Sequence, residues 1–78
     1  MNIEEGVREI LRRHTSSGDL PSDLPLGATG LGLDSIAMIE VLLACEERFG
    51  VAFAEDFVAD ESLTIGGLTD HVRALAAS

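Results

Sequence analysis

The segment from Asp34 to Phe49 constrains the fold most, because its sixteen consecutive residues contain neither glycine nor proline. Most of these residues favour the helical state, and Gly50 follows at the position where glycine ends many helices. We therefore predict a helix over about 35–49. The rest of the chain shows no alternation typical of β-strands, so the sequence predicts an all-α fold.

Two further main helices are predicted, one on each side of this segment. The first covers about residues 3–14, where apolar side chains recur at intervals of three and four residues. Its apolar face consists of Ile3, Val7, Ile10 and Leu11. The last covers about residues 64–76, with Thr64 as a suitable N-cap and with Leu63 and Leu68 placed to form a hydrophobic staple. A glycine pair in its first turn weakens the helix there.

A long loop is predicted between the first two helices, over about residues 15–34. It contains both prolines and four glycines, and its leucines can anchor it on the helices. These leucines are Leu20, Leu24, Leu26, Leu31 and Leu33. The acidic stretch over about 54–60 is long enough only for a short helix. We predict one domain over residues 1–78: a small four-helix bundle of three main helices plus one short helix, with a long first loop.

The charge of the chain narrows the partners that it can bind. Fourteen acidic residues and five arginines give a net charge of -9, and residues 34–62 alone carry eight acids and one arginine. Such a surface repels nucleic acids and anionic membranes, so basic proteins are the expected partners. The acidic N-terminus is unlike a signal peptide and no apolar run approaches membrane-spanning length, so we expect a cytoplasmic protein. We also expect it to be a monomer.

The predicted helix over 35–49 has two apolar faces. The first suits a bundle core and consists of Met38, Val41, Leu42, Cys45 and Phe49. The second lies nearly opposite and consists of Ile36, Ile39 and Leu43, interspersed with Glu40, Glu46 and Glu47. Burial of this face would strip three glutamates of water, so we expect it to be exposed as a docking surface for a basic partner. Alternatively, the short helix or the loop covers Ile36 and Leu43.

Ser35 is the strongest candidate for a modification site. It lies where a glycine-containing loop meets a helix N-terminus, and the unpaired N–H groups and helix dipole there favour a phosphate group. A plainer interpretation makes Asp34 or Ser35 only the N-cap of the helix. The two interpretations are compatible.

Catalysis by the chain itself and metal binding are not predicted. A Ser-His-Asp site would need His14 or His71 beside Ser35, and neither histidine is near it in sequence. Cys45 falls on the core face and is expected to behave as a small hydrophobic residue. The acidic residues lack the spacing of a calcium-binding loop.

The motif Gly32-Leu33-Asp34-Ser35-Ile36 resembles that of the acyl carrier protein family, as do the residues that follow it. Those residues are Glu40, Leu43 and the run Glu46-Glu47-Arg48-Phe49-Gly50-Val51. The resemblance implies a four-helix bundle with a covalent 4′-phosphopantetheine arm on Ser35, preceded by Asp34. It also implies that partner enzymes recognise the second helix, which places Ile36, Ile39, Glu40, Leu43, Glu46 and Glu47 toward the partner.

The resemblance implies a carrier rather than an enzyme. Its arm would hold acyl intermediates as thioesters and present them to partner enzymes. The composition, rich in alanine, leucine, glycine and arginine and without lysine, favours polyketide or related specialised metabolism, and the short separate chain favours discrete enzymes. The expected partners are a phosphopantetheinyl transferase and acyl-loading and acyl-processing enzymes with basic docking patches. Ile36 stands where the family usually has leucine, and the chain lacks lysine. A peptidyl or aminoacyl carrier of a nonribosomal pathway and an unmodified acidic adaptor remain as alternatives.

Overall fold

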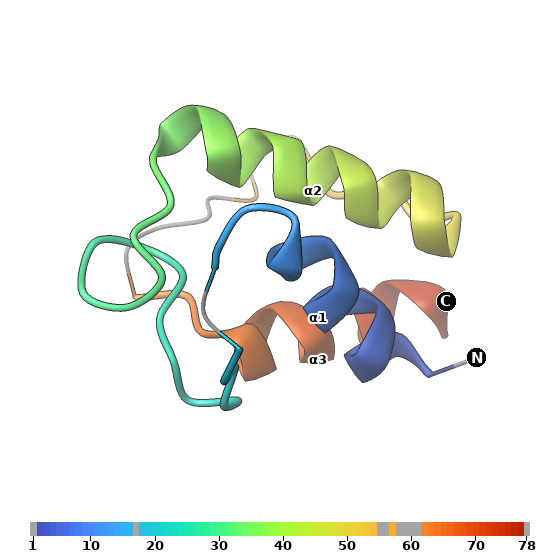
Figure 1. Cartoon of the computed structure of the whole chain (residues 1–78). Coiled ribbons are helices and arrows are strands. Elements are labelled where there is room, and N and C mark those ends of the chain that lie inside the picture. Colours follow the sequence, from blue (N-terminus) through green and yellow to red (C-terminus); the bar gives the residue numbers. More distant parts are fainter. Residues whose placement is uncertain (1, 17, 55–56, 58–61, 78) are drawn as a thin grey trace.

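The computed structural model describes residues 2–16, 18–54, 57 and 62–77. These residues form three helices and no β-strand: α1 (Ile3–Arg12), α2 (Ser35–Phe49) and α3 (Ile65–Ala76) (Figure 1). The all-α prediction is confirmed, and the bounds of α2 agree with the prediction. The short helix predicted over about 54–60 falls mostly outside the described residues. None of the described helices is long and apolar enough to cross a membrane.

Helix α1 ends two residues earlier than predicted. Asn2 caps its start by accepting a hydrogen bond from the Glu5 N–H. At the other end, the Arg13 and His14 N–H groups donate to the carbonyls three residues before them. Such short-range bonds tighten the last turn and satisfy its carbonyls. The apolar pattern identified the helix but did not predict where this tightening begins.

Helix α1 packs against both α2 and α3 (Figure 1). The core lies between the three helices and receives side chains from each of them and from the loop between α1 and α2. Its buried apolar residues are Val7, Ile10, Leu11, Leu20, Leu26, Leu33, Met38, Val41, Cys45, Phe49, Ile65, Leu68 and Val72. Leu20, Leu26 and Leu33 are therefore anchors, as predicted, and Leu24 and Leu31 pack against the same core.

Backbone hydrogen bonds also hold the loop against the start of α3. The Leu26 N–H donates to the Leu63 carbonyl at 2.8 Å, and the Gly66 N–H donates to the Ser22 carbonyl at 2.7 Å. A Cβ on Gly66 would lie 3.0 Å from that same carbonyl oxygen. Glycine at this position therefore permits a close approach of two segments, which offsets its low helix propensity. Thr64 caps α3 by accepting from the Gly67 N–H at 3.0 Å, as predicted.

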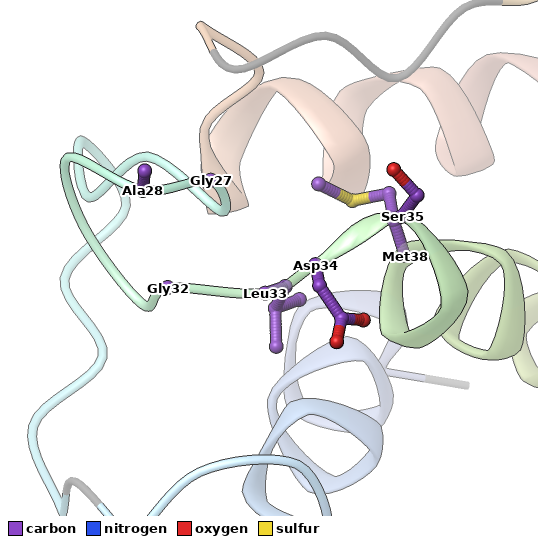
Figure 2. A pocket seen from close by; sticks show the side chains of 7 residues that line it. All are labelled: Gly27, Ala28, Gly32, Leu33, Asp34, Ser35 and Met38. Carbon is purple, nitrogen blue, oxygen red and sulfur yellow. The ribbon is translucent and has the colours of Figure 1, made fainter.

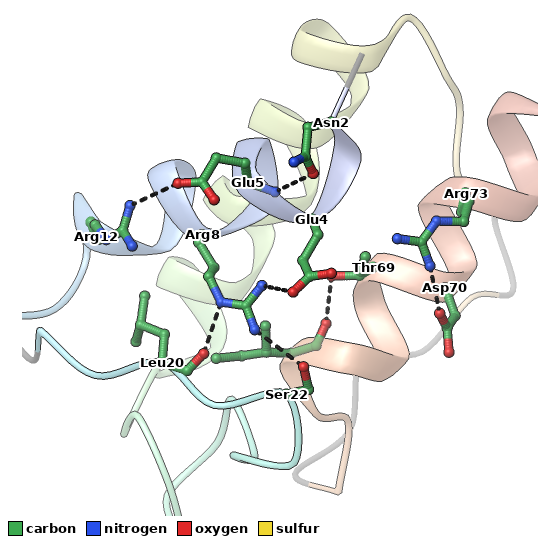
Figure 3. Close-up of polar contacts among 11 residues, drawn as sticks. Asn2, Glu4, Glu5, Arg8, Arg12, Leu20, Ser22, Thr69, Asp70 and Arg73 are labelled. Atoms are coloured by element: carbon green, nitrogen blue, oxygen red, sulfur yellow. Dashed lines mark hydrogen bonds and ion pairs between the residues drawn. The ribbon is translucent and has the colours of Figure 1, made fainter.

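Arg8 on α1 provides a second attachment for the loop (Figure 3). Its guanidinium donates to the Leu20 carbonyl at 2.9 Å and to the Ser22 hydroxyl at 3.1 Å, and it forms an ion pair with Glu4. One half-buried side chain therefore ties the first half of the loop to α1. The loop is held at several points before it reaches α2.

Candidate functional site

Asp34, not Ser35, caps helix α2. Its backbone is extended, and its carboxylate Oδ1 accepts a hydrogen bond from the Ala37 N–H at 2.8 Å. Asp34 therefore fills the N-cap position, which leaves Ser35 as the first residue of the helix. The capping role considered for both residues belongs to Asp34, so the Ser35 hydroxyl is not needed for it.

Ser35 is exposed beside an open hollow of about 370 Å³. The hollow is lined by Gly27, Ala28, Gly32, Leu33, Asp34, Ser35 and Met38 (Figure 2). Figure 2 shows the Asp34 carboxylate and the Ser35 hydroxyl on opposite sides of the chain where it enters α2. The hydroxyl thus stands at a helix N-terminus with open space next to it, in a setting that favours a phosphate group.

A tight turn fixes the approach to Ser35. The Gly30 and Gly32 N–H groups both donate to the Gly27 carbonyl, and the Leu33 N–H donates to the Leu26 carbonyl at 3.0 Å. Gly32 has a positive φ of 79°, which glycine adopts without strain. The side chain of Leu33 is buried in the core. The residue two positions before Ser35 is therefore anchored, and the hydroxyl has a defined position.

The second apolar face of α2 is exposed, as expected. Ile36, Ile39 and Leu43 are 71%, 57% and 54% accessible to solvent, and Glu40 and Glu47 beside them are also exposed. The loop between α1 and α2 therefore does not cover Ile36 and Leu43, and the short helix of the alternative interpretation falls mostly outside the described residues. The core face of α2 is buried at Met38, Val41, Cys45 and Phe49, whereas Leu42 is only half-buried.

Glu46 has a structural contact that the sequence did not indicate. It is half-buried, and its Oε2 accepts a hydrogen bond from the Phe53 N–H at 2.8 Å. This bond ties the chain that follows α2 back onto the helix. Glu46 therefore differs from Glu40 and Glu47 within the predicted partner-facing set, because one of its oxygens is already used inside the protein.

The other candidate reactive groups lie in packed surroundings. The His71 ring stacks on Phe53 and Phe57, with ring centroids 5.5 Å and 4.3 Å away. Cys45 is fully buried, and burial raises the pKa of its thiol to about 11. A thiol with so high a pKa is a poor nucleophile near neutral pH. No group of side chains suited to hold a metal ion occurs among the residues that the structure describes.

Comparison with known proteins identifies the family. The profile of the family described as "Phosphopantetheine attachment site" matches residues 3–72. A curated relative, the acyl carrier protein of Desulforapulum autotrophicum, is 25% identical over 75 residues, which cover 94% of this chain and 96% of the relative. No solved structure matches the chain significantly.

A covalent phosphopantetheine group requires an accessible hydroxyl with space around it, and the start of α2 meets both requirements. The match covers the three helices up to Val72 and includes the loop that leads to Ser35. The chain therefore belongs to the phosphopantetheine-binding family, as a carrier of the acyl carrier protein type whose prosthetic group is a covalently attached 4′-phosphopantetheine.

Proposed function

We propose that this protein carries its 4′-phosphopantetheine arm on Ser35 and presents acyl intermediates to separate enzymes of polyketide or related specialised metabolism. The observation that carries the proposal is the exposed Ser35 hydroxyl at the capped N-terminus of a 15-residue helix, beside an open hollow. The arm supplies a thiol that holds an acyl group as a thioester. The chain itself holds and positions the arm.

Asp34 and Ser35 have separate roles in this proposal. Asp34 fixes the first turn of α2 through its bond to the Ala37 N–H, and this places the Ser35 oxygen. A phosphate ester on that oxygen lies near the positive end of the helix dipole, which contributes roughly 0.3–1 kcal/mol in exposed settings. Because the Asp34 carboxylate and the Ser35 hydroxyl lie on opposite sides of the chain (Figure 2), we assign activation of the hydroxyl to the phosphopantetheinyl transferase.

The exposed face of α2 is the proposed docking surface for partner enzymes. Ile36, Ile39 and Leu43 provide apolar contact area, and Glu40 and Glu47 attract basic groups on the partner. Glu46 contributes charge at the edge of this surface while it holds Phe53. Carrier proteins in general meet phosphopantetheinyl transferases and acyl-processing enzymes, and both classes would dock here.

The proposal is tested by the intact mass of the protein after incubation with coenzyme A, Mg²⁺ and a broad-specificity phosphopantetheinyl transferase. We expect the mass to rise by one phosphopantetheinyl group per chain. An adaptor that works without modification would keep its original mass. If the protein stayed completely unmodified at high transferase concentration, the carrier function would be rejected in favour of the unmodified adaptor.

Charge reversal on the docking surface should slow modification although Ser35 is unchanged. For Glu40→Lys we expect kcat/KM of the transferase reaction to fall about fivefold, because a rim charge acts mainly on association. Asp70→Lys is the matched control, since it makes the same charge change at an exposed position on α3. Initial rates at low and moderate salt measure the effect. An equal fall of kcat/KM in the two variants would show that only net charge matters. That result would contradict the proposed docking surface.

A further inference from the structure

The five arginines are not equivalent in their surroundings. Four form ion pairs with acidic residues: Arg8 with Glu4, Arg12 with Glu5, Arg48 with Glu9 and Arg73 with Asp70. Arg13 is exposed and forms no ion pair with any residue that the structure describes. Within the described part of a chain that has nine surplus negative charges, one arginine is therefore available to a partner.

Arg13 borders a hollow between α1 and α2. The hollow measures about 220 Å³ and is lined by Ile10, Arg13, Ala44, Glu47 and Arg48. Glu47 belongs both to this hollow and to the proposed docking surface. The hollow is therefore continuous with that surface, on its side toward α1.

Positive charge gathers around this hollow. Glu9 accepts a hydrogen bond from Arg48 at 2.8 Å, and this bond lowers the pKa of Glu9, as do the charges of Arg48, Arg12 and Arg13. The charges of three arginines thus act on one glutamate of α1. A partner that lies over both regions meets negative charge at Glu40 and Glu47 and positive charge at Arg13.

From this charge pattern we infer that Arg13 is part of the docking surface and pairs with a carboxylate of the phosphopantetheinyl transferase. The inference rests on the proposed function. The transferase must act on the Ser35 oxygen itself, so its body lies directly against α2, whereas enzymes that process the cargo reach it through the arm. Ala44 in the hollow lies nine residues after Ser35, about 14 Å along the helix axis. A common interface of about 800 Å² per partner is roughly 30 Å across, enough to cover both positions.

Two opposite charges on one surface fix the orientation of the partner better than a uniformly acidic face does. A partner with only a basic patch could bind at several positions along Glu40 and Glu47. A carboxylate of the partner that pairs with Arg13 fixes the position of the partner on α2. A carboxylate of the partner opposite an acidic residue would be repelled, so wrong orientations are disfavoured.

The test compares Arg13→Gln with Arg12→Gln in the transferase reaction of the full chain. Each variant removes one positive charge at the end of α1, but only Arg13 lines the hollow. For Arg13→Gln we expect the KM for the carrier to rise about three- to fivefold with kcat unchanged, as for the loss of an exposed ion pair. Arg12→Gln should keep its KM within about twofold, and Arg13→Lys should restore most of the loss.

An effect of net charge alone would change the KM for the carrier in the opposite direction. Both glutamine variants make the protein more acidic, which strengthens its attraction to a basic enzyme and lowers KM. An unchanged or lower KM for Arg13→Gln would overturn the inference. If Arg13→Gln and Arg12→Gln had the same KM and both melted at a lower temperature than the unaltered protein, the inference would also fail. Arg13 would then only stabilise the C-terminal end of α1 through the helix dipole. Failure of the unaltered chain to accept any phosphopantetheine would overturn the proposed function itself, before any variant is compared.

Discussion

Replacement of Phe49 by alanine is expected to destabilise the fold by about 3–5 kcal/mol, which is most of the stability of so small a domain. Phe49 is 9% exposed and ends α2 with its ring against α1. A Cβ on Gly6 would lie only 2.7 Å from the Phe49 Cζ, so the ring fills the space that this glycine leaves. Its removal leaves a cavity between the two helices. Chemical denaturation followed by circular dichroism measures the loss.

Leu43→Ala is the matched control for Phe49→Ala on the opposite face of the same helix. Leu43 is 54% exposed, so its truncation leaves little cavity, and we expect a loss of under about 1 kcal/mol. The two variants therefore separate the core face from the docking surface. If Leu43→Ala unfolded the chain and Phe49→Ala did not, the assignment of the two faces would be inverted.

The second large effect is expected for Gly30→Ala, in the turn that precedes Ser35. A Cβ on Gly30 would lie 2.0 Å from the Pro25 carbonyl oxygen, which also accepts the Leu31 N–H at 3.0 Å. Backbone must move to admit the methyl group, and we expect a loss of about 3 kcal/mol. Because the same turn leads to Ser35, modification of the variant should also be slower than that of the unaltered protein.

Gly18→Ala is the control for this loop. Among the described residues, no atom outside its chain neighbours lies within 4 Å of a Cβ at Gly18, so we expect a change within about 0.5 kcal/mol. Thermal melting of the two variants compares them directly. Equal stability of Gly30→Ala and Gly18→Ala would show that the turn before Ser35 has a different conformation.

Local signals in the sequence were sufficient to predict helix α2 and its surroundings. Asp34 caps its start and Gly50 ends it with a positive φ of 64°, so both boundaries depend on residues within the segment itself. The two faces of α2 followed from helical periodicity for the same reason. The position of Ser35 at the helix start, and hence the candidate site, was predictable from the same few residues.

Contacts between distant segments were not predictable in this way. Glu46 appeared as one more exposed glutamate, because nothing near it in sequence indicates its bond to the Phe53 N–H. Gly66 appeared only to weaken α3, although it permits the close approach of the Ser22 carbonyl. Arg13 stood out only after the ion pairs of the other arginines were known. Each of these roles depends on tertiary packing, which periodicity does not report.

The central claim, that Ser35 carries the arm, is tested most directly by locating the added group in fragments of the modified protein. We expect the mass of one phosphopantetheinyl group on the peptide that contains Ser35. Ser35→Ala should then remain unmodified with normal helicity, whereas Ser16→Ala, at another exposed serine, should be modified fully. Modification of Ser35→Ala, or an added group on a peptide without Ser35, would contradict the assignment.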